Sequence, residues 1–152
     1  MTLANMTAEE TKKQNTETCK YIAHNLEAVA SGQLVRCDEC GDVFDMYNVV
    51  DEEWQTGVAC PHCGEECYPE ELSIYEWLDD ALDITYTMDS LGEMRGASVM
   101  VTCGGPNIYV NTLHMRVELY WWGDKADYPI LRDACEALDE ALQESFEAVK
   151  AS

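Results

Sequence analysis

Helical periodicity marks three stretches of the chain. Within residues 7–30, apolar residues recur three or four positions apart, and Thr7 is the expected N-cap. A second helix is predicted from Pro69 to about Met88, because leucine and tyrosine residues there mark one face. A third helix, the most periodic of the three, is predicted to follow Asp127. The N-terminal and C-terminal parts of the chain are therefore expected to be rich in helix.

Three strands are predicted between the second and third helices. Residues 97–102, 107–111 and 115–121 are rich in strand-forming residues, and Gly104-Gly105-Pro106-Asn107 is a turn signal between the first two. Three antiparallel strands covered by helices make an α+β domain. We therefore expect the α+β fold class, with a three-stranded antiparallel sheet packed with helices.

Residues 33–69 have a different pattern, with short apolar runs around paired cysteines. Cys37-x-x-Cys40 and Cys60-x-x-Cys63 are separated by 19 residues, a spacing typical of zinc sites. Glycine follows each pair and permits the chain to turn there. The expected organisation is an N-terminal amphipathic helix (1–32), a zinc-ribbon module (33–69) and an α-β-β-β-α domain (70–152).

The four cysteines predict one structural Zn²⁺. Two residues between cysteines let both thiolates reach one ion, and four thiolates fill a tetrahedral site without leaving a position for substrate. Iron is the competing metal, since it also suits four sulfur ligands. Cys67 lies four residues beyond Cys63 and is an alternative ligand. Cys19, Cys103 and Cys135 lack partner spacing and are expected to be buried apolar thiols.

The chain is strongly acidic, with 30 acidic residues, 9 basic residues and a formal net charge of -21. Residues 36–93 hold seventeen acidic residues and a single basic residue, Arg36, and so carry 16 of those net charges. Direct binding of nucleic acid or of an anionic membrane is disfavoured, because both need lysine and arginine. A basic protein surface is the favoured partner, and a solvated acidic face is the alternative interpretation. The candidate partner-binding residues are Asp51, Glu52, Glu53, Glu70, Glu71, Glu76, Asp79 and Asp80, interleaved with aromatic residues such as Trp77.

Signals for catalysis, secretion and membrane insertion are weak. The three histidines lie on separate segments, and no nucleophile or phosphate-binding motif stands out. No apolar run approaches the roughly 20 residues needed to span a bilayer. We expect a non-enzymatic cytoplasmic protein.

Two resemblances give this expectation a context. The cysteine pairs resemble zinc-ribbon or rubredoxin-like knuckles. The stretch 104–111, Tyr120-Trp121-Trp122-Gly123 and the acidic last helix resemble small phage and mobile-element proteins of gut bacteria, a few of which are anti-CRISPR inhibitors. This resemblance implies a bacterial host cell and a protein that blocks target DNA loading by a type II CRISPR effector nuclease. A zinc-ribbon adaptor that bridges proteins in transcription or replication is the alternative, and a metalloenzyme would need an open or redox-active metal site.

Overall fold

The computed structural model describes residues 7–46 and 57–151, which adopt the expected α+β fold class. The elements in chain order are α1 (Ala8–Ala30), β1 (Leu34–Arg36), β2 (Val43–Asp45), β3 (Val58–Ala59), β4 (Glu66–Cys67), β5 (Glu70–Glu71), α2 (Ile74–Asp79), β6 (Asp83–Met88), β7 (Met94–Thr102), β8 (Asn107–Asn111), β9 (Arg116–Trp121), β10 (Asp124–Pro129) and α3 (Arg132–Ala151).

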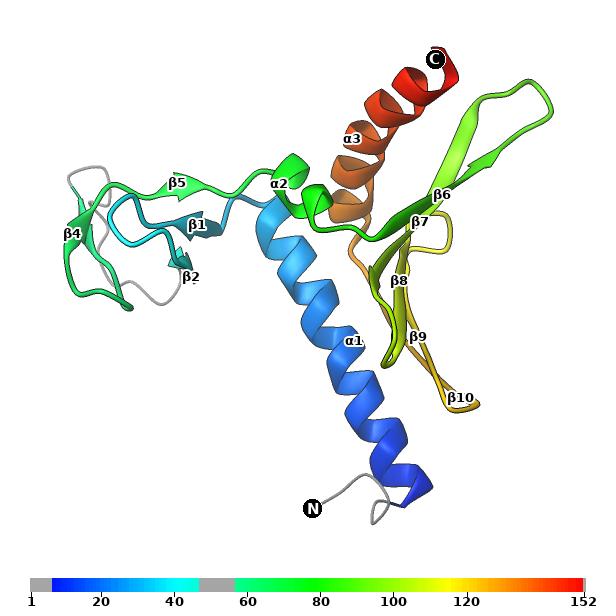
Figure 1. Ribbon diagram of the computed structural model, residues 1–152, viewed down its shortest axis with the longest axis horizontal. Coiled ribbons are helices and arrows are strands. Elements are labelled where there is room, and N and C mark those ends of the chain that lie inside the picture. The colour runs from blue at the N-terminus through cyan, green and yellow to red at the C-terminus, as the bar shows by residue number, and fades with distance from the viewer. Residues whose placement is uncertain (1–6, 47–56, 152) are drawn as a thin grey trace.

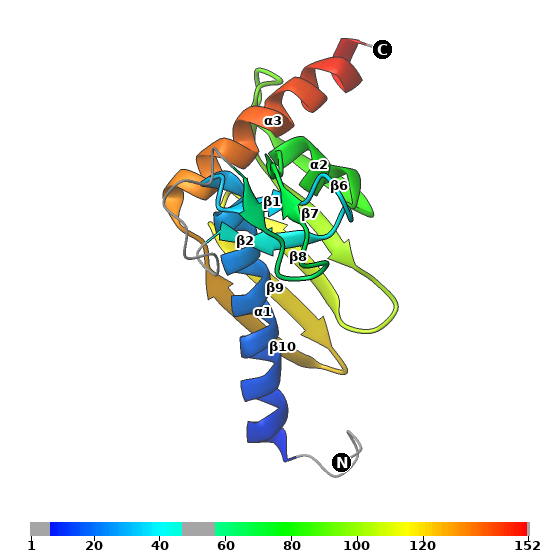
Figure 2. The same cartoon turned by 90° about the vertical axis from the view of Figure 1, so that its left-hand side faces the viewer.

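A five-stranded antiparallel meander forms the main sheet, in the order β10-β9-β8-β7-β6. Helices α1 and α3 lie on one face of this sheet, and the opposite face carries no helix from the described part of the chain (Figures 1 and 2). Alternate residues of the strands point at the helices, as the two-residue period of a strand requires. Val99, Val110, Val117 and Leu119 are each fully buried there, against Leu138 and other apolar residues of the two helices.

The paired cysteines lie in a separate small unit that is inserted between α1 and α2. We call β1 to β5 with their connections the cysteine module. Its described strands form two sheets, β2-β1-β5 and β3-β4. Figure 1 shows it projecting sideways from the C-terminal end of α1, away from the main sheet. Its apolar cluster is distinct from the main core and consists of Val35, Cys37, Phe44, Val58, Cys60 and Cys67, with Met46 at its margin.

The predicted helix from Pro69 to Met88 is wrong. Glu70 and Glu71 form β5, which pairs with β1, and the helix itself is only α2. Helix α2 begins after Ser73, because Ser73 and Glu76 form a reciprocal capping box that satisfies free backbone amides. Beyond Asp80 the alternation of isoleucine, threonine and tyrosine favours a strand, and this segment is β6.

The predicted three-stranded sheet is incomplete, and the third helix starts later than expected. The three predicted strands are present as β7, β8 and β9, but β6 and β10 extend the sheet on both sides. The last helix was predicted to follow Asp127, but Pro129 ends β10, where an edge strand tolerates proline, and α3 begins at Arg132. Trp122 and Gly123, both with positive φ, connect β9 to β10 in a two-residue turn.

The N-cap prediction for the first helix is confirmed. The Thr7 hydroxyl accepts a hydrogen bond from the Glu10 amide at 3.1 Å, which satisfies one of the first free amides of α1. The helix ends at Ala30, where the predicted range 7–30 also ends, and Ser31 is its C-cap. In the part of the chain that the structure describes, no helix combines the length and the apolar character that crossing a membrane requires.

The packing of the sheet against the helices predicts that alanine substitutions at two leucines near α3 have very different effects on stability. Leu138 is fully buried, whereas Leu131 is 66% exposed just before the helix starts. Leu138→Ala removes buried methyl groups and leaves a cavity, so it should lower the free energy of unfolding by about 2–5 kcal/mol. Leu131→Ala should change it by less than about 0.5 kcal/mol. Urea denaturation of both variants measures the two changes in the free energy of unfolding. Equal changes would contradict the assignment of Leu138 to the core.

Candidate metal centre and the adjacent groove

The two cysteine pairs sit in loops that are built alike. In the first, Cys37 follows β1 and Gly41 precedes β2; in the second, Cys60 follows β3 and Gly64 precedes β4. The Cys37 amide donates to the Asp42 carbonyl, and the Gly41 amide donates back to the Cys37 carbonyl. The second loop repeats both bonds between Cys60, Glu65 and Gly64. The same local folding therefore occurs twice and presents two similar faces to one another.

Backbone amides in each loop point at the sulfur of the first cysteine. The Glu39 and Cys40 amides lie 3.3 and 3.4 Å from the Cys37 Sγ. The His62 and Cys63 amides lie 3.4 and 3.5 Å from the Cys60 Sγ. Such N–H···S hydrogen bonds stabilise the negative charge of a thiolate. The chain fold thus prepares these two sulfurs to act as charged ligands.

Glycine is required after each pair because of the backbone conformation. Gly41 has φ +79° and Gly64 has φ +77°, in the left-handed region that residues with a Cβ rarely adopt. No atom crowds the position where a Cβ would stand at either glycine. The requirement is therefore conformational, and it lets the chain reverse directly after the second cysteine of each pair.

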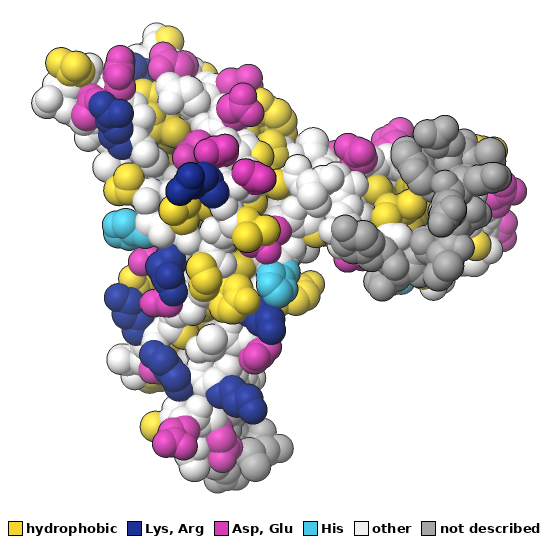
Figure 3. All heavy atoms as spheres, turned by 180° about the vertical axis from the view of Figure 1, so that it is seen from behind, with side chains coloured by type: hydrophobic (Ala, Val, Ile, Leu, Met, Phe, Trp, Pro, Cys, Tyr) yellow, Lys and Arg dark blue, Asp and Glu magenta, His cyan; other side chains and the backbone are white. Residues whose placement is uncertain are grey.

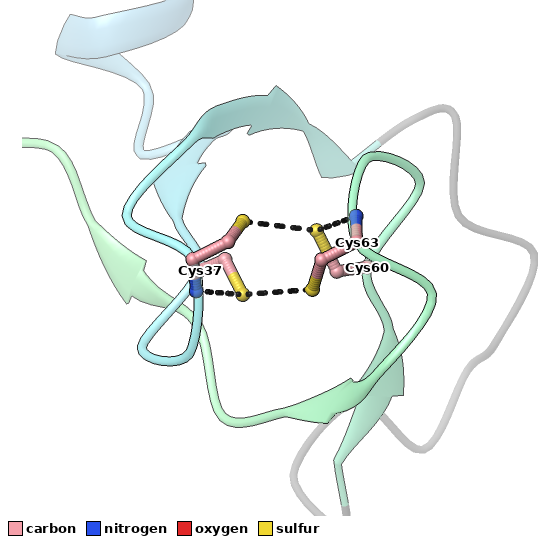
Figure 4. Close-up of side chains that lie close together, drawn as sticks. Cys37, Cys60 and Cys63 are labelled. Carbon is pink, nitrogen blue, oxygen red and sulfur yellow. Dashed lines mark hydrogen bonds between the residues drawn. The ribbon is translucent and has the colours of Figure 1, made fainter.

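The four thiols meet at one place between the two loops. The Cys37 and Cys63 sulfurs are 4.0 Å apart, and the Cys40 and Cys60 sulfurs are 3.7 Å apart. All four lie within 4.8 Å of one another (Figure 4). A tetrahedral ion with metal–sulfur bonds of about 2.3 Å places its ligands about 3.8 Å apart. The cluster could therefore hold one metal ion with little rearrangement.

The electrostatics of the cluster favour loss of a first proton and oppose loss of further ones. The Cys40 amide, with other amide and thiol hydrogen bonds, lowers the pKa of the Cys37 thiol to about 6. A hydrogen bond from the backbone amide of Asp42 lowers the pKa of the Cys40 thiol. Burial and hydrogen bonds with the neighbouring thiols outweigh this effect and raise that pKa to about 12. Several thiolates so close together repel one another. A divalent cation removes that repulsion by replacing the protons.

Cys67, the alternative ligand, is a core residue of the module. It is fully buried in β4, pairs with Val58 of β3, and lies near Cys37 and Asp38 rather than among all four clustered thiols. Burial, followed by a hydrogen bond with Cys37, raises the pKa of its thiol to about 12. Cys67 thus supports the Cys37 side of the site, and the four-thiol group is complete without it.

The remaining cysteines divide into two kinds. Cys19 and Cys135 are buried as expected, and burial raises the pKa of each thiol to about 11. Cys103 is exposed, so the expectation of a buried thiol there is wrong. It follows the end of β7 in the turn toward β8, where the strand alternation no longer directs it to the core.

The described members of the predicted acidic set come from two elements, β5 and α2. Glu70 and Glu71 are exposed on β5, and Asp79 and Asp80 are exposed at the end of α2. Asp51, Glu52 and Glu53 lie outside the described residues. Further exposed carboxylates on the two cysteine loops are those of Asp38, Glu39, Asp42, Glu65 and Glu66. Figure 3 shows dark blue lysine and arginine side chains gathered on the helix–sheet body, whereas the charged side chains visible on the projecting module are acidic.

Glu76 has a structural role that its sequence position does not reveal. Its carboxylate accepts a hydrogen bond from Arg36 and closes the capping box with Ser73. The Arg36 hydrogen bond, with the amide of Ser73, lowers the pKa of the Glu76 carboxyl. This half-exposed ion pair links β1 to α2, and it engages the only basic side chain in the sequence between residues 36 and 93.

A groove of about 610 Å³ lies in the angle between the module and the helices. Tyr21 of α1 and Trp77 of α2 contribute aromatic rings to it, and Asp80 contributes a carboxylate. Tyr21 is 72% exposed, while Trp77 is half-buried against the main core. The complete lining is Tyr21, Asn25, Leu34, Arg36, Val43, Phe44, Asp45, Pro61, His62, Leu72, Glu76, Trp77 and Asp80.

The sequence pattern missed Tyr21 as a member of this groove. Tyr21 lies off the apolar stripe of α1, which is the signal that it is exposed, but nothing local links it to α2. The link arises because α1 and α2 both lie beside the base of the module. Trp77 lies off the predicted apolar stripe of its own helix and is in the groove.

Comparison with known proteins identifies no relative of this chain. No family model, no curated protein and no solved structure matches it.

Cys40 and Cys103 are both exposed, but only Cys40 belongs to the four-thiol cluster, so only Cys40 should be needed for metal binding. Cys40→Ser replaces a clustered thiol, so it should weaken metal binding by more than about 100-fold, beyond the effect of losing an outer-shell partner. Cys103→Ser changes an equally exposed thiol outside the cluster and should retain one metal ion per chain. Elemental analysis after competition with a chelator measures both, and equal metal retention by the two variants would contradict the site.

Proposed function

We propose that this chain is a non-enzymatic, zinc-stabilised acidic protein that binds a basic surface of another protein. The observation that carries the proposal is the groove beside the cysteine module, where Tyr21 of α1 lines the same hollow as Trp77 and Asp80, which are far from it in the chain. The surrounding exposed surface of the module is acidic. A basic segment of a partner is the ligand that these groups complement.

Zinc is the metal that we assign to the four cysteines. Tetrahedral sites made of four thiolates suit zinc or iron, and paired C-x-x-C loops around one ion are the usual structural zinc arrangement. Since all four positions are taken by sulfur, the ion has a structural role and offers no place for a reacting water. The module has few buried apolar residues, so metal binding supplies much of its folding free energy.

Arginine is the partner side chain that fits the groove best. Its planar guanidinium group stacks on aromatic faces and also forms charge-assisted hydrogen bonds to carboxylates. Tyr21 and Trp77 provide aromatic groups, and Asp80 provides an exposed carboxylate at the same groove. Arg36, which also lines the groove, is paired with Glu76. Asp80 is therefore the carboxylate that an arginine of the partner would bind.

The charge distribution supports fast and selective encounter with such a partner. Of the 21 net negative charges, 16 lie between residues 36 and 93, in the module and the segment that follows it. A concentrated field of one sign attracts a basic surface and accelerates association, and the effect falls as salt screens it. The same field repels nucleic acid, so we propose competition with nucleic acid for a basic channel rather than binding to it.

In its most concrete form, the proposal is an anti-CRISPR protein that occupies a basic channel of a type II RNA-guided nuclease and blocks target DNA loading. This version rests on the resemblance to phage and mobile-element proteins together with the acidity of the chain. The alternative function is a zinc-ribbon adaptor in transcription or replication. Binding to a basic protein of that machinery, with cleavage by the nuclease unchanged, would favour the adaptor over the anti-CRISPR protein.

The groove predicts a preference for arginine over lysine. An arginine-rich peptide should bind more tightly than a lysine-rich peptide of equal length and charge, because stacking adds about 0.5–2 kcal/mol, or roughly 2- to 30-fold in Kd. Tyr21→Ala and Asp80→Lys should remove most of this preference. Asp79→Lys makes the same charge change at a residue outside the groove, and it should retain the preference.

Isothermal titration calorimetry at two salt concentrations checks the binding prediction, and a cleavage assay with a purified type II effector checks the concrete version. Equal affinity for both peptides would remove the groove from the proposal. Undiminished cleavage at saturating protein would remove the anti-CRISPR version while leaving the general one in place.

A further inference from the structure

The two edges of the five-stranded sheet are protected to different degrees. Strand β10, at one edge, carries Asp124, Lys125, Asp127 and Pro129. Helix α1 also lies against it, and Lys12 of that helix donates a hydrogen bond to the carbonyl of Lys125. Charged residues, proline and a covering helix are the means by which natural proteins prevent an edge strand from pairing with another chain. The β10 edge is therefore closed.

Strand β6, at the other edge, is less protected, because Asp83 at its start is its single charged residue. Residues 84–88 read Ile-Thr-Tyr-Thr-Met, with no charge and no proline, in a chain of which 26% of residues are charged. Among residues 7–46 and 57–151, no strand pairs with the outer side of β6. Leu82 and Met88, near its two ends, are 59% and 57% exposed. An uncharged, strand-forming edge flanked by exposed apolar side chains is a site for pairing with a further strand.

A groove of about 520 Å³ runs beside this edge, between β6 and the C-terminal half of α3. Ile84, Tyr86 and Met88 line it from the strand, and Phe146 lines it from the helix. The rings of Tyr86 and Phe146 are in contact, with centroids 5.3 Å apart. The apolar side of an added strand would thus meet an apolar surface that is already in place.

We propose that the β6 edge pairs with the β6 edge of a second copy of this chain, in an antiparallel arrangement about a two-fold axis. With the axis at Thr85, Ile84 of one copy lies opposite Tyr86 of the other, and Leu82 lies opposite Met88. Residues directly opposite one another in an antiparallel pair share a face. This register therefore places apolar residues opposite apolar residues on one face of the sheet. On the other face, Thr85 of one copy lies opposite Thr85 of the second copy.

The charges at the two ends of the groove match this arrangement. Asp83 lies at the start of β6, and Lys150 reaches the far end of the groove, where it donates a hydrogen bond to the carbonyl of Gly92. In this register Asp83 of each copy lies opposite Thr87 of the other, at the end of β6 that Lys150 adjoins. A two-fold interface needs such self-complementary ends, because each patch meets its own copy.

The net charge of -21 opposes this association, and its effect has a definite salt dependence. Two strongly negative copies repel one another over a long range, and salt screens that repulsion. The dimer should therefore strengthen as salt is added. Binding of a basic partner to the module should weaken under the same conditions, so the two associations are separable, and the dimer does not depend on the proposed function.

Light scattering coupled to size exclusion, at low and at raised salt, tests the dimer. We expect a mass twice the 17.1 kDa of one chain at high protein concentration, with a larger dimer fraction at raised salt. Thr85→Lys places two lysines across the axis and should leave a folded monomer. Gln14→Lys adds the same charge at an exposed position on α1 and should leave the dimer intact.

Thermal melts establish whether each variant is folded. If Thr85→Lys does not fold, Met88→Lys at the end of the β6 edge tests the dimer in its place. A wild-type chain that stays monomeric at high concentration in both salt conditions would overturn the proposal. So would a folded Thr85→Lys or Met88→Lys variant that dimerises as well as the wild type.

Discussion

The convergence of four thiols in a module with little core of its own is the constraint on which the structure depends. Sulfurs 3.7–4.0 Å apart cannot all lose their protons without a counter-charge, yet amide hydrogen bonds already favour a thiolate at Cys37. A divalent ion bound by the four thiolates would resolve this conflict and would join the two loops, which are otherwise linked by short strands. The groove at the base of the module is lined by residues of α1, β1, β2 and α2 and by none of the four clustered cysteines.

The distribution of charge and apolar surface gives the molecule two ends with different chemistry. The module and α2 carry most of the negative charge, and the groove between them presents aromatic rings beside a carboxylate. Residues 84–88 of the β6 edge are uncharged and border a groove lined mainly by apolar side chains, with Asp83 and Lys150 at its ends. If the two surfaces act as we propose, a dimer would present two acidic modules, and a partner with two basic sites would bind it with avidity. Neither surface requires a catalytic group.

The sequence predicted what depends on local spacing and missed what depends on tertiary contacts. The two C-x-x-C pairs specify their loops locally, so the four-thiol cluster could be predicted before any fold was known. The strand over residues 84–88 was missed because leucines upstream of it continue a helical spacing, whereas α2 ends at Asp79 with Asp80 as its C-cap. Strand β10 was missed because Pro129 suggests a helix start as readily as the end of an edge strand. Tyr21 and Trp77 meet at one groove only because the folded chain brings their two helices together.

X-ray absorption spectroscopy at the metal edge of the purified full-length protein tests the central claim most directly. The account predicts zinc with four sulfur neighbours at about 2.3 Å and no nitrogen or oxygen neighbour. A first shell that contains nitrogen or oxygen would mean that the four cysteines do not together close the site. A folded protein that carries no metal would contradict the role that we assign to the ion in holding the module.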